Sequence, residues 1–223
     1  MTVEPSTTVE DYLLAISTIS SEGQAVIGAR LADALDVSPP TVTATVQRMT
    51  RDGLVTVDER KRMRLTTAGA ALAERMVRRH RLAECFLIDI LGLEWADVHE
   101  EAHRFEHAIS PRVEERILAV LGRPTVCPHG CIIPGTGARL ASDEIPLASV
   151  AAGEDVVIDR ISEAAEEDHE LLTYFQRSEL LPGREFRVRR IEPYNALMVL
   201  QRGGESIPIS LDVARKIWVR PVR

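Results

Sequence analysis

The residues best suited to chemistry in this sequence lie between positions 99 and 107, which read His-Glu-Glu-Ala-His-Arg-Phe-Glu-His. On an α-helix, four of these side chains fall within an arc of about 100°: His99, His103, Glu106 and His107. A second pair, His80 and Glu84, has the i, i+4 spacing that places two side chains on one helical face. Imidazoles and carboxylates are common metal ligands, and the chain has only 6 histidines. This grouping predicts one or two metal sites.

The composition is that of an ordinary globular protein, with 45% hydrophobic and 27% charged residues. A length of 223 residues allows two or three small domains. The first residues lack the basic and apolar regions of a signal peptide, and no apolar run is long enough to span a membrane, so we expect a cytoplasmic protein without a membrane partner. The 3 cysteines do not form a disulfide framework.

The N-terminal third has the pattern of a winged helix-turn-helix. Apolar spacing predicts a helix over residues 7–19 and another over 27–35, and Ser38 is a suitable N-cap for a third helix that ends at Arg51. Residues 54–57 and 63–66 alternate like strands around the charged tip 58–62, which predicts the wing.

This module is mildly basic within a chain whose net charge is −7. That total argues against general coating of nucleic acid, but a local basic face suits contact with phosphates. Two alternatives to DNA binding stay open: the winged helix could mediate protein contacts, or the charged hairpin could be only a solvent-exposed tip. The module's basic residues are Arg30, Arg48, Arg51, Arg60, Lys61, Arg62 and Arg64.

The rest of the chain changes from helical to β-type patterns. Helices are predicted over residues 67–91, 94–108, 111–121 and 170–178, and strands over 155–161, 185–191, 196–201, 206–209 and 218–222. The first three helices show no obvious enclosed core, which suggests that their apolar faces pair across a homodimer. We therefore predict a mainly α protein with a small β domain: a DNA-binding domain (1–73), a helical dimerisation and metal-binding domain (74–140), a linker (141–150) and a β-barrel-like domain (151–223).

Several of these segments resemble the diphtheria toxin repressor and manganese transport regulator family of metal-dependent bacterial repressors, and the resemblance covers nearly the whole chain. The matching segments are residues 7–13, 48–55, 79–84, 98–107, 128–130 and 133–135. The resemblance implies that the C-terminal domain is SH3-like. It also implies a dimeric repressor that binds palindromic operators of metal-uptake genes when metal is bound, with no organic substrate.

The family's metal sites can be carried over position by position. The primary site resembles Asp11, His103, Glu106 and His107. The ancillary site resembles His80, Glu84 and His99, together with Glu163 and Glu166 from the C-terminal domain. The last two lie among residues 163–168, whose acids also fit a solvated charge run.

The donor types bear on which metal is bound. The iron-responsive branch has a methionine where Asp11 stands and a cysteine where His103 stands. Carboxylate and imidazole donors in place of sulfur suit Mn²⁺, so we expect Mn(II) at two sites per chain. The manganese branch often has a carboxylate at the position of His103, which keeps Fe(II) as the alternative metal and a repressor of iron-uptake genes as the alternative function.

The DNA-facing positions follow from the same resemblance and from the basic module. They are Arg30, Ser38, Pro40, Thr41, Thr43, Ala44, Arg48 and Arg51. Ala44 replaces a glutamine of the iron-responsive branch. A methyl group can contact a thymine methyl but cannot hydrogen-bond to a base edge, so the operator should differ.

Two rival functions compete with a metal-dependent repressor. His99-Glu100-Glu101-Ala102-His103 fits the HExxH zinc-peptidase motif, with Glu100 as general base, but the extended metzincin pattern is absent. The other rival is a metal-independent regulator with a ligand-binding C-terminal domain. Cys85 is expected to be an apolar helix residue, and Cys127 and Cys131 with His129 fit a structural role better than a metal site.

Overall fold

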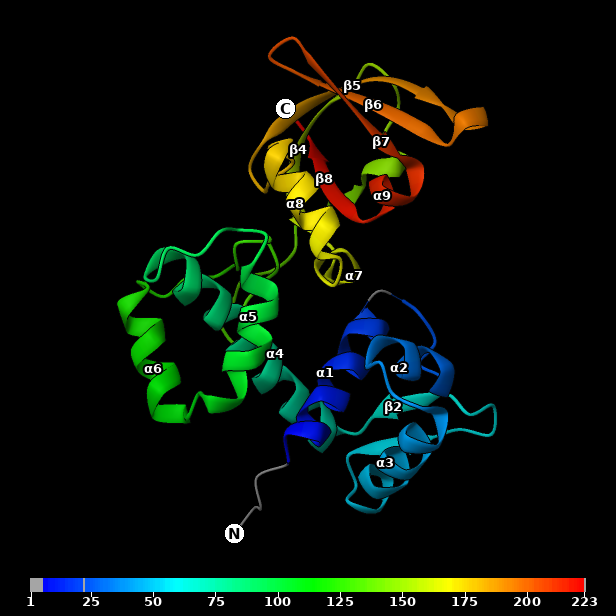
Figure 1. Ribbon diagram of the computed structural model, residues 1–223, viewed down its shortest axis with the longest axis vertical. Helices are drawn as coiled ribbons and strands as arrows, with labels where there is room; N and C mark the ends of the chain where they lie inside the picture. Colours follow the sequence, from blue (N-terminus) through cyan, green and yellow to red (C-terminus); the bar gives the residue numbers. More distant parts are fainter. Residues whose placement is uncertain (1–5, 22, 223) are drawn as a thin grey trace. The chain divides into compact units, whose positions relative to one another are not determined.

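The computed structural model describes residues 6–21 and 23–222 of the chain (Figure 1). The chain divides into two compact units, one up to His80 and one from Arg81 onward. None of the helices in the described ranges combines the length and hydropathy that a membrane span requires.

The first unit is a winged helix-turn-helix. Its helices are α1 (Thr7–Ser21), α2 (Gly28–Ala34) and α3 (Pro39–Arg51). Ser38 caps α3 as predicted, because its side chain accepts a hydrogen bond from the Thr41 N–H, and Pro39 takes the first helical position. The wing pairs β1 (Val55–Val57) antiparallel with β2 (Met63–Leu65).

A hydrophobic core holds these helices and the wing together. Apolar residues of α1 lie fully buried against residues of α2 and α3, and Val55 of β1 joins the same core. The carboxylate of Asp58 organises the tip of the wing, since it accepts hydrogen bonds from the backbone N–H groups of Arg60 and Arg62 and forms an ion pair with the Arg62 guanidinium. The first unit therefore presents α3 and the wing on a rigid frame.

Helix α4 (Thr67–Asp89) continues from the first unit into the second. In the second unit it is followed by α5 (Val98–Phe105), a 3₁₀ turn η1 (Glu106–Ala108) and α6 (Pro111–Val120). These helices have a core of their own, which includes Leu82, Val98 and Ile117 and is completed by Cys127, Cys131 and Ile133 of the following loop. The expectation that the helices enclose no core was therefore wrong, because periodicity within helices does not show that a loop covers them.

The C-terminal part is a six-stranded antiparallel sheet of order β3-β8-β4-β5-β6-β7. The strands are β3 (Ile145–Pro146), β4 (Asp155–Ile161), β5 (Glu185–Glu192), β6 (Leu197–Arg202), β7 (Glu205–Ser210) and β8 (Ile217–Pro221). Short helical segments accompany it: η2 (Leu147–Ser149), α7 (Glu163–Glu166), α8 (His169–Arg177), η3 (Pro193–Asn195) and α9 (Leu211–Arg215). Leu172 and Phe175 of α8 are buried in the core formed by the strands.

Candidate metal centre

The first group of predicted ligands lies where α5 gives way to η1. Glu106 is fully buried, and its Oε1 lies 3.4 Å from Nδ1 of His103 and 3.6 Å from Nε2 of His107. The sequence explains why the regular helix ends here, since Ser110 and Pro111 begin the next helix. The backbone continues as the 3₁₀ turn η1, and the side chains of His103, Glu106 and His107 stay close together. We refer to His103, Glu106 and His107 as the first cluster.

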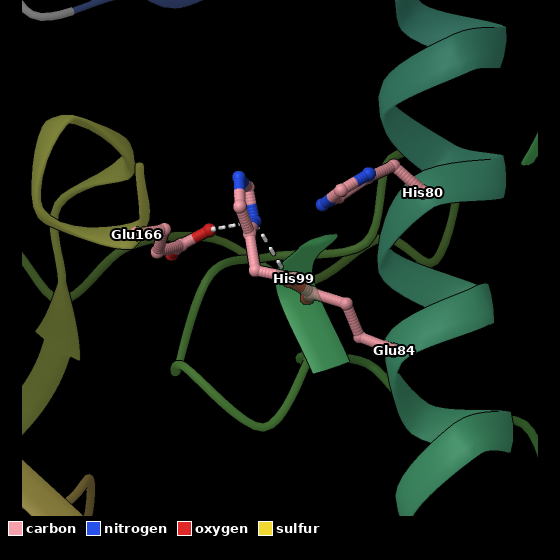
Figure 2. Close-up of side chains that lie close together, drawn as sticks. All are labelled: His80, Glu84, His99 and Glu166. Atoms are coloured by element: carbon pink, nitrogen blue, oxygen red, sulfur yellow. Dashed lines mark hydrogen bonds and ion pairs between the residues drawn. The ribbon is translucent and has the colours of Figure 1, made fainter. Parts of the chain in front are cut away.

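The second group of side chains comes from three elements. Glu84 on α4 is fully buried, His99 on α5 is 8% exposed and Glu166 on α7 is 4% exposed. His99 Nδ1 lies 3.3 Å from Glu84 Oε1 and 3.3 Å from Glu166 Oε2. Figure 2 shows the His99 imidazole between Glu166 on one side and the α4 residues His80 and Glu84 on the other. Ligand atoms of all four residues lie within 4.8 Å of one another, and we call this group the second cluster.

Two further donors adjoin the second cluster from the loop after α6. His129 is fully buried and its Nδ1 lies 3.0 Å from Glu84 Oε1, while Cys127 is 4% exposed and groups with the same two residues. The loop packs tightly on β4: the Ile161 N–H donates to the His129 carbonyl, and a Cβ at Gly130 would overlap the Asp159 carbonyl oxygen. From the sequence alone, a structural role is the expectation for Cys127 and His129. Their proximity to Glu84 could not be read from the spacing of a loop.

The second cluster concentrates negative charge inside the protein. Burial lowers the pKa of His99, but hydrogen bonds to Glu166 and the neighbouring carboxylates outweigh burial and raise that pKa from 6.5 to about 12. Burial also opposes the charged form of His129, whereas the charges of Glu84 and Glu166 raise its pKa. The buried carboxylates thus require a positive charge next to them. Without a bound cation, protonated imidazoles supply that charge.

These features fit a divalent cation. Carboxylate and imidazole donors suit Mn²⁺ or Fe²⁺, and the adjoining thiol of Cys127 is a softer donor. Nε2 of His129 is buried and has no hydrogen-bond partner among the described residues. A bound cation would replace the protons on the imidazoles and balance the carboxylates.

The two remaining predicted ligands are Glu163 and Asp11. Glu163 forms an ion pair with the guanidinium of Arg81 and belongs to neither cluster. Asp11 lies half-buried on α1 in the first unit, whereas the first cluster belongs to the second unit. Its part in metal binding stays a prediction.

The predicted DNA-facing residues share the outer surface of the first unit. Val42, Thr45, Val46 and Met49 of α3 point into the core, and the predicted contact residues of that helix are all exposed. Between α3 and the wing lies a groove of about 800 Å³, whose lining includes Thr43, Arg51 and Lys61. A recognition helix beside a basic wing suits the major groove and flanking phosphates of duplex DNA.

Most of the chain matches domains of known proteins. Residues 4–63 match the iron-dependent repressor N-terminal DNA-binding domain, residues 66–135 the metal-binding and dimerisation domain of the same repressors, and residues 145–221 the FeoA domain. The chain is 36% identical to the iron-dependent repressor IdeR of Mycobacterium leprae, over 96% of this chain and 97% of that protein. It belongs to the family of metal-dependent repressors that includes the diphtheria toxin repressor. The diphtheria toxin repressor of Corynebacterium diphtheriae is itself 33% identical over 95% of this chain and 96% of its own length.

A solved member of this family has the same fold. A manganese-dependent transcriptional repressor in complex with manganese superposes with a TM-score of 0.86 at 32% identity, covering 96% of this chain and 100% of that one. The chain is accordingly a metal-dependent DNA-binding transcriptional repressor with a dimerisation domain. The winged helix, helical domain and SH3-like domain predicted from the sequence are confirmed.

Family membership also decides the peptidase alternative. These proteins are transcriptional repressors and not enzymes. The structure agrees at the residue that peptidase chemistry would need. Glu100 is exposed and forms an ion pair with Arg104 on the outer side of α5.

Proposed function

We propose that this repressor is activated by Mn(II), bound at two sites per chain, and that it then binds as a homodimer to palindromic operators of metal-uptake genes. The observation that carries the choice of metal is the first cluster, in which a buried carboxylate lies between two imidazoles without a sulfur donor. Asp11 would supply a further hard donor from the DNA-binding unit. The second cluster would form the other site, with His80, Glu84, His99 and Glu166 as donors and Cys127 and His129 beside them.

The protein's own residues have defined parts in this scheme. Glu106 and the two flanking histidines hold the cation at the dimerisation domain, and Asp11 on α1 would bring the DNA-binding unit to it. The cation supplies the positive charge that lets these carboxylates lie together. Restricting the orientation of α1 would restrict α3 as well, because both helices share one core.

Fe(II) is the second candidate metal. Two observations favour it: relatives of 36% identity are named iron-dependent repressors, and Cys127 adds a thiol beside the second cluster. The metal-independent regulator is no longer a candidate, because the chain belongs to a family of metal-dependent repressors.

Operator binding measured against each metal separates these candidates. Anaerobic mobility-shift titrations with Mn²⁺ and Fe²⁺ use an operator selected from random duplexes. We expect Mn²⁺ to produce binding at concentrations where Fe²⁺ gives little, and a chelator to abolish it. Activation by Fe²⁺ alone would replace the manganese proposal, and operator binding that persists in chelator would contradict activation by either metal.

A further inference from the structure

Arg81 joins the three segments that supply most donors of the second cluster. It follows His80 on α4, and its guanidinium donates to the carbonyl of Ile132 and to a carboxylate oxygen of Glu163. Ile132 belongs to the loop that carries Cys127 and His129, and Glu163 opens α7, which carries Glu166. One side chain thus contacts the loop and α7 at the same time.

The two residues of the ion pair have the same spacing from the two ligand carboxylates on their helices. Arg81 precedes Glu84 by three residues on α4, and Glu163 precedes Glu166 by three residues on α7. Residues three apart on a helix lie on the same face. The ion pair of Arg81 with Glu163 is therefore about one turn away from the place where Glu84 and Glu166 meet.

The ligand carboxylates need such support. Glu84 and Glu166 are like charges in a buried site and repel one another when no cation lies between them. Helix α7 has only 4 residues, too few to keep its position by helix formation alone. The ion pair of Arg81 with Glu163 is an attractive contact between the same two helices, and it offsets that repulsion. The two side chains are only 17% and 18% exposed.

We propose that Arg81 and Glu163 form a latch that positions Glu166 and the loop of Cys127 and His129 around the second metal site, and that Glu163 is a positioning residue and not a ligand. The latch rests on the proposed second site. It makes the affinity of that site depend on a contact with the SH3-like domain, while the first cluster does not depend on it.

A double-mutant cycle tests the latch. Isothermal titration of the metal-free full-length protein with Mn²⁺ is compared for wild type, Arg81→Gln, Glu163→Gln and the double variant. Glu84→Gln identifies the second-site event. We expect each single variant to weaken that event by about ten- to hundredfold, as loss of residues that orient metal ligands does, and to leave the other event unchanged.

The double variant distinguishes a latch from a ligand. In a latch the two side chains act as one, so the double variant should bind at the second site no more weakly than the worse single variant. If Glu163 were a ligand, its substitution would weaken binding by the same further factor whether or not Arg81 is present, and the latch would be refuted. Unchanged second-site affinity in both single variants would refute it too.

Two controls keep the result interpretable. Asp212→Asn removes an exposed ion pair with Arg215 in the same unit and should leave both events unchanged. The unchanged first event in the latch variants shows that the helical domain remains folded. A wild-type protein with only one event would instead overturn the proposed second site, which is distinct from failure of the latch alone.

Discussion

At the scale of single residues, His129 shows how a loop residue can complete a site formed on helices. It is fully buried, lies 3.0 Å from Glu84 and packs its ring 4.5 Å from the indole of Trp95. The indole N–H in turn donates to the Pro128 carbonyl, which fixes the ring beside the loop. Trp95 therefore reports on this part of the second cluster.

This contact predicts an optical signal for metal binding. The chain has 2 tryptophans, and Trp218 packs under the guanidinium of Arg160 on the sheet. Because paramagnetic Mn²⁺ quenches nearby fluorescence, saturating the second site should quench Trp95. We expect Trp218→Phe to retain the quenching and Trp95→Phe to lose it. Undiminished quenching of Trp95 in Glu84→Gln would place the metal elsewhere.

At the scale of elements, the sequence predicted the regular pieces well and their junctions poorly. Apolar periodicity and the Ser38 cap located α3, and alternation located β4 at Asp155–Ile161. Helix α7 was missed, because four residues carry no periodicity and their acids fit a solvated run equally well. Helical spacing placed Glu106 with His103 and His107, but only tertiary packing could pair Glu163 with Arg81 and bring His129 to Glu84.

The cap of α3 allows stability and DNA contact to be measured separately. Ser38→Ala removes the acceptor for the Thr41 N–H and should lower the free energy of unfolding of the first unit by about 1 kcal/mol. Ser38→Asp keeps a good cap and should keep that stability, yet its charge would repel phosphate and weaken operator binding. Thermal unfolding and mobility shifts check the pair. Equal operator affinity in Ser38→Asp and wild type would remove Ser38 from the DNA-facing set.

At the scale of the whole molecule, the proposed mechanism is a coupling between two binding events. The ligands of the first cluster belong to one unit and Asp11 to the other. A cation held by both would favour the orientation of α3 that an operator also favours. By linkage, the factor by which metal strengthens DNA binding must equal the factor by which DNA strengthens metal binding.

This reciprocity gives a quantitative test of Asp11. For the wild type we expect operator DNA to tighten Mn²⁺ binding at the first site by about 5- to 150-fold, the usual range of such coupling, and saturating Mn²⁺ to tighten operator binding by the same factor. In Asp11→Ala both factors should fall toward one, with the dimer and the second-site event intact, as sedimentation and titration calorimetry would record. Glu10→Ala, one residue earlier on α1, is the matched control and should keep both factors. If Asp11→Ala lost metal affinity but retained the coupling, the connection between the units would have to pass through other residues.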